Sequence, residues 1–413
     1  MTRRPRLLFL SPIMPAQGGN GLAMRAGFFL DAYAREFDVD LAVFPIAGAL
    51  HWPDDFARSR SDRFRLFPLP PVDAHFALIS ATMDLDARLA AFRQYGRPSL
   101  TSRTGAAARA MLDSWVADQD YDAVHVSRLY LAPLAERWLS RSSAGRPRLF
   151  VDCDDDDETA FRRTALIARR DRRPHDAAWA EIEASGFRNM ARLALPRVDR
   201  AFAASAVVAA ALSAHAAVTV IPNVIPSGAR PVHRAPRREQ TVLLVGNLGY
   251  RPNEEGASWF LKHVWPALQR GVRGPLRFLL AGSQPAARLV RLARRRDVSL
   301  SASVSDIAAC YGVADIAVVP IRSGSGTRIK LIEAAAYGVP AVSTTIGAEG
   351  TAFRHGRDLL LADATDSFTG ACIDLLMHRE HAVRLGRRAR ITAVQNYDAV
   401  RWRRHLLGLV TNR

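Results

Sequence analysis

The feature that most constrains this chain is an alternation of short apolar segments with longer amphipathic ones, which runs through both halves of the sequence. In the first half the apolar segments predict strands and the amphipathic ones predict helices. The expected strands are Arg6–Ser11, Val39–Phe44, Ala123–Val126 and Leu149–Val151, and the expected helices are Ala23–Glu36 and Ala106–Gln119. Such alternation is typical of a parallel sheet with helices on both faces, which is an α/β fold. The region from His51 to Ser102 is less regular, and we expect insertions or helices facing a cleft there.

A second set of alternating segments follows residue 240. Its expected strands are Thr241–Val245, Leu276–Ala281, Ile316–Pro320 and Ala341–Thr344, and its expected helices are Glu255–Leu268, Arg328–Tyr337 and Ser367–Met377. A chain of 413 residues corresponds to about two domains. We therefore predict a first domain over residues 1–226, a linker rich in Pro and Arg over 227–239, and a second domain over 240–394. Ligands of open α/β sheets sit at the carboxyl ends of the strands, so both domains are expected to offer loops to a cleft between them.

The charge balance is strongly basic, with 57 Lys and Arg against 40 Asp and Glu and a net charge of +17. Nearly all of these basic residues are arginine, because Lys262 and Lys330 are the two lysines of the chain. A GC-rich genome explains this bias without a function, and attraction to anions is the alternative. No long basic tract is interleaved with aromatic residues, so we expect no nucleic-acid partner. Five arginines of the first domain are candidates for weak contact with an anionic membrane, namely Arg3, Arg4, Arg6, Arg58 and Arg60.

Three features bear on where the chain works. Its cysteines lie far apart and match no zinc or disulfide pattern, which fits a reducing compartment. The apolar core of the N-terminus is only Leu7–Leu10, which favours a first strand over a signal peptide. Ala201–Ile221 lacks charged residues but is rich in Ala and ends at Pro222, which favours strand, short helix and strand over a membrane span. We therefore expect a cytoplasmic protein that is peripheral at the inner membrane face where its acceptor is lipid-linked.

The segment Ile321–Pro340 carries the clearest chemical signal. A strand is expected to end at Pro320, a loop of small residues follows, and a helix begins near Arg328. Small residues ahead of a helix let backbone N–H groups approach an anion, and the helix N-terminus adds partial positive charge. Gly326, Lys330 and Glu333 have the spacing of one helix face. This order predicts a nucleotide site, with Lys330 at the diphosphate and Glu333 at the ribose hydroxyls. The alternative is a surface helix with a Lys–Glu pair; the spacing of a Walker motif is absent.

This segment resembles the donor-binding motif of the retaining family-4 glycosyltransferases, which have the GT-B fold. Glu333 matches the second Glu of the family's Glu-x7-Glu pattern, whereas Ser325 stands where the first Glu is usual. Ile346–Gly350 resembles a subgroup linked to exopolysaccharide and cell-surface sugar assembly. The resemblance implies two Rossmann-like doubly wound domains that face a central cleft. It also implies a C-terminal helix, within residues 395–413, that crosses back onto the first domain.

The resemblance also implies a set of donor-binding residues. These are Gly19, Asn20, Gly21, Asn247, Gly282, Val304, Gly324, Ser325, Gly326, Thr327, Arg328 and Glu333. Asn247 replaces a basic residue common in the family, so Arg251 is our candidate for the charge beside the diphosphate, with a surface arginine as the alternative. A dinucleotide fingerprint is the alternative for the first glycine loop, and it fails because Met24 stands where a third Gly or Ala belongs.

Residues near the expected acceptor side are less certain in role. His125 ends an expected strand where family members often place a catalytic histidine, and a structural strand-end histidine is the alternative. Arg128 is a candidate acceptor contact on the same grounds. Asp152–Glu158 follows a strand, and its crowded carboxyls predict raised pKa values unless a cation or arginine neutralises them. We expect Asp152 or Asp154 near the acceptor and the later Asp residues near solvent, Arg162 and Arg163. An Mg²⁺ or Mn²⁺ site is the alternative.

The sequence therefore predicts a glycosyltransferase of hexosyltransferase type. It would move a sugar from a UDP- or GDP-linked donor to a glycan or lipid-linked acceptor with retention, and it would use no metal or other cofactor. Lys330, Arg251 and His125 are the expected catalytic residues. A sugar-nucleotide epimerase with a related fold is one alternative. An inactive nucleotide-sugar-binding or scaffold protein is the other, because Ser325 replaces the first Glu.

Overall fold

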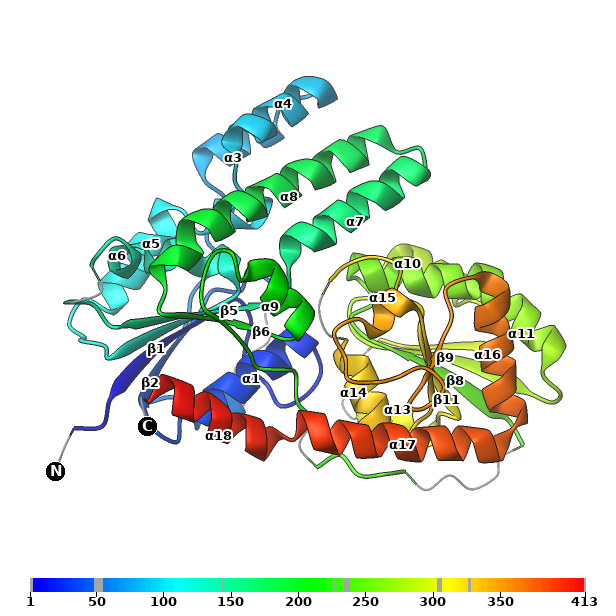
Figure 1. Cartoon of the computed structure of the whole chain (residues 1–413). Coiled ribbons are helices and arrows are strands. Elements are labelled where there is room, and N and C mark those ends of the chain that lie inside the picture. Colours follow the sequence, from blue (N-terminus) through cyan, green and yellow to red (C-terminus); the bar gives the residue numbers. More distant parts are fainter. Residues whose placement is uncertain are drawn as a thin grey trace.

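The computed structural model of the chain describes residues 3–47, 55–142, 145–225, 228–232, 238–302, 307–325 and 328–411. These residues form two α/β units that lie side by side (Figure 1). Each unit is built on one sheet whose paired strands are all parallel, which confirms the predicted fold class. The domain boundaries at residues 226 and 240 stay a prediction.

The first sheet has seven strands in the order β3-β2-β1-β4-β5-β6-β7. Its strands are β1 (Arg6–Ser11), β2 (Asp38–Val43), β3 (Arg63–Leu66), β4 (Ala123–Ser127), β5 (Arg148–Asp154), β6 (Arg200–Ala203) and β7 (Val218–Val220). The order reverses between β1 and β4, and in doubly wound sheets the loops after two such strands part to form a crevice. The loops after β1, β4 and β5 carry the candidate site residues of this unit.

The helices of the first unit cover this sheet and also extend beyond it. They are α1 (Gly21–Tyr33), α2 (Asp55–Arg58), α3 (Ala74–Ser80), α4 (Leu85–Tyr95), α5 (Ala106–Trp115), α6 (Glu136–Leu139), α7 (Asp157–Arg170), α8 (Pro174–Ala194) and α9 (Ala206–Leu212). Helices α7 and α8 form a long hairpin that projects from the sheet together with α3 and α4, at the top of Figure 1. Gly186 lets α8 pack closely against the backbone at Pro98. A Cβ on Gly186 would lie 2.7 Å from the Pro98 nitrogen.

The second sheet has six strands in the order β10-β9-β8-β11-β12-β13. Its strands are β8 (Gln240–Val245), β9 (Leu276–Ala281), β10 (Val298–Ser301), β11 (Ile316–Val319), β12 (Ala341–Ser343) and β13 (Leu360–Leu361). Its helices are α10 (Arg251–Trp259), α11 (Trp265–Gly271), α12 (Ala287–Leu292), α13 (Ile307–Val313), α14 (Ile329–Ala336), α15 (Thr345–Ala348) and α16 (Thr365–Met377). A π-helical turn, Phe260–Val264, joins α10 to α11.

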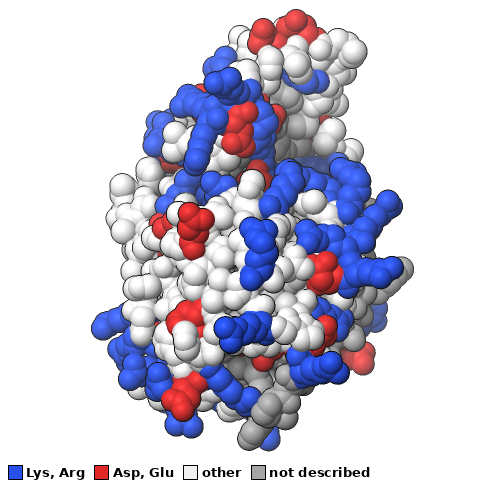
Figure 2. Space-filling model, turned by 90° about the vertical axis from the view of Figure 1, so that its right-hand side faces the viewer, with Lys and Arg blue, Asp and Glu red and all other residues white. Residues whose placement is uncertain are grey.

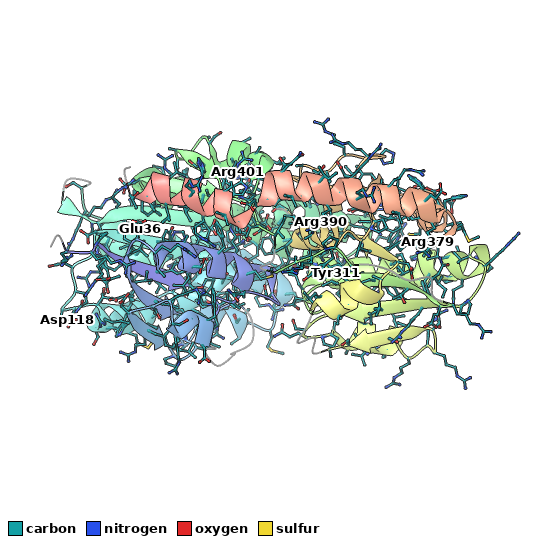
Figure 3. The ribbon with its side chains drawn as sticks, turned by 90° about the horizontal axis from the view of Figure 1, so that it is seen from below. Glu36, Asp118, Tyr311, Arg379, Arg390 and Arg401 are labelled. Carbon is teal, nitrogen blue, oxygen red and sulfur yellow. The ribbon has the colours of Figure 1, made fainter. Side chains whose placement is uncertain are left out.

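Two C-terminal helices, α17 (Arg379–Tyr397) and α18 (Ala399–Val410), run along one side of both units, as the view from below shows (Figure 3). Helix α17 packs on α14, and α18 packs on α1. Leu406 and Val410 of α18 are buried in the same apolar cluster as Phe29 and Phe150 of the first unit. Arg148 of β5 also donates a hydrogen bond to the carbonyl oxygen of Val410, at 2.8 Å. The last helix therefore lies on the first unit.

Several predictions from the sequence can be compared directly with the structure. The segment 201–221 contains β6, α9 and β7, as predicted. Among the described residues, no helix is both long and apolar enough to cross a membrane. Strand β3, at the edge of the first sheet, was not predicted, and neither were α7 and α8.

The basic side chains do not gather in one place on the end of the molecule formed by the second unit. They are spread over that face with acidic side chains among them (Figure 2). In the first unit, three of the five arginines proposed to contact a membrane form ion pairs, Arg3 with Asp122, Arg4 with Asp38 and Arg60 with Asp31. These pairs leave that surface with less net positive charge than the sequence alone implies.

Candidate functional site

Two glycines bring backbone close together at the carboxyl ends of β8 and β9. Gly246 and Gly282 both have a φ of 152°, which favours glycine. A Cβ on Gly282 would lie 1.7 Å from the carbonyl oxygen of Gly246, so no side chain fits there. A Cβ on Gly246 would lie 3.1 Å from Nζ of Lys330. The strand ends therefore form a bare backbone surface beside the one buried lysine of the described chain.

Lys330 lies in the first turn of α14 and is 8% exposed. Its Nζ donates to Oδ1 of Asn253 in α10, and Nδ2 of Asn253 donates to the carbonyl oxygen of Asn247, at 2.8 Å. Burial, together with the nearby positive charge of Arg328, lowers the pKa of Lys330 to about 7, against the opposing charge of Glu333. A buried amine with a lowered pKa regains its charge when an anion binds beside it. The predicted position of Lys330 next to an anion site thus has a physical basis.

Glu333 lies one turn further along the same helix and is 3% exposed. Burial raises the pKa of Glu333 to about 7, against the opposing effects of a hydrogen bond from Tyr311 and the charge of Lys330. The Tyr311 hydroxyl donates to Oε2 of Glu333 at 3.1 Å, and its ring stacks on Tyr337 with centroids 4.9 Å apart. Figure 3 shows Tyr311 in the second unit, on the side below α17. Tyr311 holds the carboxyl in place, and the sequence did not single it out.

The loop before α14 is held by contacts among its own neighbours. Nη2 of Arg328 donates to the carbonyl oxygen of Ser323 at 3.2 Å, and a Cβ on Gly324 would lie 2.8 Å from the same nitrogen. Ser323 also donates to Oε2 of Glu255 at 3.2 Å, while Oε1 of Glu255 accepts from Arg251 at 2.8 Å. Arg251 is therefore in the first turn of α10, tied to this loop through Glu255. The predicted donor residues Val304, Gly326 and Thr327 lie outside the described residues.

The first glycine loop faces the start of α14. Asn20 caps α1 by accepting a hydrogen bond from the Leu22 backbone nitrogen at 2.8 Å, and Gly19 has a φ of 89°. A Cβ on Gly21 would lie 3.1 Å from Cγ2 of Ile329. The N-termini of α1 and α14 therefore meet between the two units, where their partial positive charges favour an anion.

The acidic segment that begins at the end of β5 is neutralised by arginines. Arg25 binds both carboxylate oxygens of Asp152, at 2.7 and 2.6 Å. Asp154 lies 3.3 Å from Arg25 and 3.2 Å from Arg128, and Arg128 binds both oxygens of Asp157 at 2.7 and 2.9 Å. Asp152 is fully buried, which favours a structural role over contact with an acceptor. No group of three or more metal-ligating side chains suited to an ion occurs within the described ranges.

Two carboxyls of this segment keep the raised pKa that crowding predicts. Burial raises the pKa of Asp157 to about 7, although the charge of Arg128 opposes the rise. Burial also raises the pKa of Asp154, against the charges of Arg25 and Arg128. Arg128, with a φ of 74°, thus holds the segment rather than reaching freely into the cleft.

The sequence predicted that His125 ends its strand, but the strand continues beyond this residue. Strand β4 continues to Ser127, and His125 is fully buried within it. Its Nδ1 lies 2.8 Å from the Tyr33 hydroxyl, and its ring packs against Phe9 and Phe29 with centroids 5.0 and 4.7 Å away. Burial lowers the pKa of His125 to about 3, so the ring stays neutral. This position favours the structural histidine, which the sequence left open, over a catalytic one.

Two contacts cross between the units and were not predicted. The Ser325 hydroxyl lies 2.5 Å from Oδ1 of Asp155 and 2.5 Å from the carbonyl oxygen of Asp156. Arg163 of α7 binds both oxygens of Glu349 at 2.6 and 2.8 Å and donates to the carbonyl oxygen of Gly324 at 2.9 Å. The sequence placed Arg163 beside the later Asp residues, whereas its ion pair is with Glu349, and Arg162 pairs with Glu158 at 2.7 Å.

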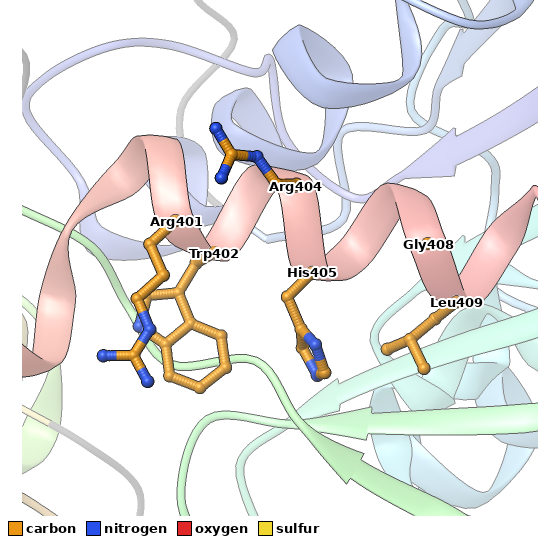
Figure 4. Close-up of a pocket in the computed structure, with 6 residues that line it drawn as sticks. All are labelled: Arg401, Trp402, Arg404, His405, Gly408 and Leu409. Carbon is orange, nitrogen blue, oxygen red and sulfur yellow. The ribbon is translucent and has the colours of Figure 1, made fainter. Parts of the chain in front are cut away.

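Cavity size alone does not identify the site. A hollow of about 480 Å³ lies on α18 and is lined by Arg401, Trp402, Arg404, His405, Gly408 and Leu409 (Figure 4). It contains none of the residues described above. A smaller cavity of about 220 Å³ lies between the units, lined on one side by Met24 and Phe28 of α1 and on the other by Ile329 of α14. Ile329 is the residue of α14 that lines this cavity, so the site is assigned from the chemistry of Lys330 and Glu333 rather than from cavity size.

Part of the chain matches a known protein family. Residues 239–378, which contain β8, β9 and α14, match the model of the family described as group 1 glycosyl transferases. An uncharacterised 44.6 kDa protein in the cps region of Klebsiella pneumoniae is 30% identical over 130 residues. That match covers 30% of this chain and spans only a third, 33%, of the Klebsiella protein.

Solved structures resemble the chain over nearly its whole length. Sucrose-phosphate synthase from Thermosynechococcus elongatus superposes with a TM-score of 0.69 at 15% identity, and the match covers 99% of both chains. Anabaena HepE in complex with UDP-glucose gives a TM-score of 0.65 at 12% identity, over 99% of this chain and 100% of that one. At such low identity the likeness establishes the fold, which is GT-B. The family match within residues 239–378 and the shared fold together support a glycosyltransferase of group 1 type.

Proposed function

We propose that the chain transfers a sugar from a nucleotide diphosphate sugar to a hydroxyl group of an acceptor, with retention at the anomeric carbon. The observation that carries this proposal is the pair Lys330 and Glu333. Both are buried on α14, and Nζ of Lys330 lies next to the bare backbone of Gly246. A buried cation suits a diphosphate, and a buried carboxylate one turn deeper suits the ribose hydroxyls. The UDP-glucose bound to HepE supports a nucleotide sugar as donor.

The leaving group sets the main demand on the site. The bond between the anomeric carbon and the phosphate oxygen breaks, and the nucleotide diphosphate departs with the electron pair. Lys330, Arg328 and the N-terminus of α14 would stabilise this growing negative charge, and Arg251 of α10 would assist. The acceptor oxygen bonds to the same face of the sugar and passes its proton to the departing phosphate oxygen. No separate protein base is needed, which agrees with a buried, neutral His125.

The identity of the acceptor rests on fewer observations than that of the donor. A glycan or a lipid-linked sugar of cell-surface polysaccharide assembly is our proposal, and the position of the Klebsiella relative in a cps region supports it. Donor binding would need no metal, because arginines already neutralise the acidic segment that begins at the end of β5. Contact with an anionic membrane would be weak, since Arg3, Arg4 and Arg60 are paired with carboxylates.

Activity of matched variants tests this function. Lys330→Ala and Glu333→Ala should each lower sugar transfer by about 100-fold or more, because each removes a group that binds the departing nucleotide. Lys262→Ala and Glu380→Ala are the controls, since both side chains lie on the surface. The readout is multiple-turnover release of nucleotide diphosphate that depends on an acceptor. Wild-type rates in both site variants would rule out this site.

A further inference from the structure

The loop before α14 offers no carboxylate of its own among its described residues. Ser323, Gly324 and Ser325 supply two hydroxyls and backbone, and Ser325 is 3% exposed. A carboxylate nevertheless stands at this loop, because Oδ1 of Asp155 lies 2.5 Å from the Ser325 hydroxyl, which donates to it. Asp155 belongs to the other unit, one residue after the end of β5. The first unit thus places an acidic group directly on the donor loop.

The surrounding hydrogen bonds hold this carboxylate in a defined position. Oγ of Ser325 also lies 2.5 Å from the backbone oxygen of Asp156, although its single proton is donated to Asp155, and the Asp156 nitrogen donates to Oδ1 of Asp155 at 3.1 Å. Beside them, Arg163 joins Glu349 and the carbonyl oxygen of Gly324. Both described hydrogen bonds to the Asp155 side chain end on Oδ1. Its second oxygen therefore has capacity for further donors, as a carboxylate accepts about four.

Asp155 differs from its acidic neighbours in the charge of its described side-chain partner. Asp152, Asp154 and Asp157 are bound directly by Arg25 or Arg128. Asp155 instead has the neutral Ser325 as its described side-chain partner. Partial burial of Tyr250, which is 44% exposed, raises its pKa, and the negative charges of Asp155 and Asp157 add to the rise. Tyr250 lies in the loop between β8 and α10, so Asp155 lies within electrostatic reach of both donor loops of the second unit.

We propose that Asp155 binds hydroxyl groups of the transferred sugar, so that the first unit supplies the carboxylate that the donor loop lacks. This inference rests on the proposed function, because it assumes a diphosphate at Lys330 and Arg328. A sugar attached to that diphosphate would extend past Ser325 toward the first unit. Sugar hydroxyls are donors, and a carboxylate accepts from two of them at once. Asp155 then helps to select the sugar of the donor, and the complete sugar site forms only where the two units meet.

The test separates the sugar from the nucleotide. Binding of UDP, GDP, UDP-glucose, UDP-galactose, UDP-N-acetylglucosamine and GDP-mannose is measured by calorimetry on the wild type, Asp155→Asn and Asp86→Asn. Asp86 is the control, because its side chain is 89% exposed on α4. Asp155→Asn should bind the free nucleotide as the wild type does, within about twofold. It should bind the preferred nucleotide sugar about 10- to 100-fold more weakly, as expected for a lost charged hydrogen bond.

Two further variants exclude a purely structural role. Glu349→Gln breaks the other cross-unit contact but keeps Asp155, so it should leave the preference for the nucleotide sugar over the free nucleotide unchanged. Asp155→Asn combined with Ser325→Glu returns a carboxylate to the loop and should regain at least about tenfold of the lost affinity. Equal loss in Glu349→Gln, or no regain in the double variant, would overturn the proposal. Wild-type protein that binds none of the nucleotides would refute the proposed function itself, whereas unchanged sugar binding in Asp155→Asn would refute this inference alone.

Discussion

Arg25 and Asp152 form a doubly hydrogen-bonded ion pair that is shielded from solvent. Nε and Nη2 of Arg25 lie 2.7 and 2.6 Å from the two carboxylate oxygens, and the side chains are 1% and 0% exposed. The third nitrogen, Nη1, donates to the carbonyl oxygen of Ile221 at 2.8 Å. One arginine thus joins α1, the end of β5 and the segment that leaves β7 for the second unit.

This geometry predicts a large loss of stability in Arg25→Met. The change leaves the Asp152 carboxylate buried without its partner, which costs about 3–5 kcal/mol. Arg35→Met is the matched control, because Arg35 lies 3.7 Å from Asp31 with 55% of its side chain exposed. Such a surface pair contributes about 0–1 kcal/mol. Urea unfolding measures both, and equal midpoints for the two variants would contradict the structural role given to the buried pair.

The close approach of Gly246 and Gly282 predicts that Gly282→Ala is not tolerated. Its Cβ would lie 1.7 Å from a backbone oxygen, so the ends of β8 and β9 would have to separate. We expect loss of nucleotide binding, together with a free energy of unfolding lowered by several kcal/mol, roughly as for other severe core changes. Gly370→Ala is the control, since its Cβ would meet nothing within 4 Å. A Gly282→Ala protein that binds nucleotide normally would show that the strand ends are not part of the site.

The lowered pKa of Lys330 predicts that nucleotide binding depends on pH. Below pH 7 the amine is already charged, but above pH 7 it must take up a proton when a diphosphate binds. Affinity should then fall by up to about tenfold per pH unit as the pH rises above 7. Calorimetry in buffers of different ionisation enthalpy detects the proton. Lys330→Arg should bind with little change over the same range, because arginine stays charged. A wild-type affinity that is flat from pH 7 to 9 would count against this role.

Glu183 of α8 predicts a second pH effect, this time on folding. It is 2% exposed, both of its oxygens accept from the Ser99 backbone nitrogen, and burial raises its pKa to about 7. The folded state therefore keeps a proton that the unfolded state releases above the ordinary value of 4.5. Stability from this group is present below about pH 4.5 and is lost as the pH rises to 7, by up to about 3 kcal/mol.

Comparison with Glu183→Gln isolates that effect. Glutamine stays neutral, while Glu333 and His125 contribute equally to both proteins. The wild type should therefore lose stability relative to Glu183→Gln between pH 4.5 and 7, as followed by chemical unfolding at several pH values. A constant difference across this range would show that Glu183 ionises normally in the folded protein.

Much of the fold could be predicted from local pattern. Strand β1 and strand β9 have the bounds that their apolar runs indicate, because a buried parallel strand is a short apolar segment between polar ends. Strand β3 was not predicted, since RFRL alternates charged and apolar residues at the edge of the sheet. Helices α7 and α8 were missed for a related reason. Helix α7 is rich in charged residues, and half of the buried residues of α8 are alanines, so the hairpin shows few large apolar residues.

The same distinction between local patterns and long-range contacts applies to the site. Lys330 and Glu333 could be predicted because their relation is local, one helix face after a small-residue loop. The burial of His125 could not be predicted, because the tyrosine and phenylalanines that enclose it come from β1 and α1, far away in sequence. The partners Asn253, Tyr311 and Asp155 depend on how elements pack across and between the units. No spacing in the chain encodes the 2.5 Å approach of Ser325 to Asp155.

The central claim, that α14 holds a nucleotide diphosphate, is tested most directly by titrating UDP and GDP into the wild type, Lys330→Ala and Lys262→Ala. These variants remove in turn the two lysines of the chain, one buried in the site and one on the surface. We predict that one of the nucleotides binds the wild type and Lys262→Ala alike, and that Lys330→Ala binds it about 10- to 100-fold more weakly. Equal affinity of Lys330→Ala and the wild type would contradict the claim.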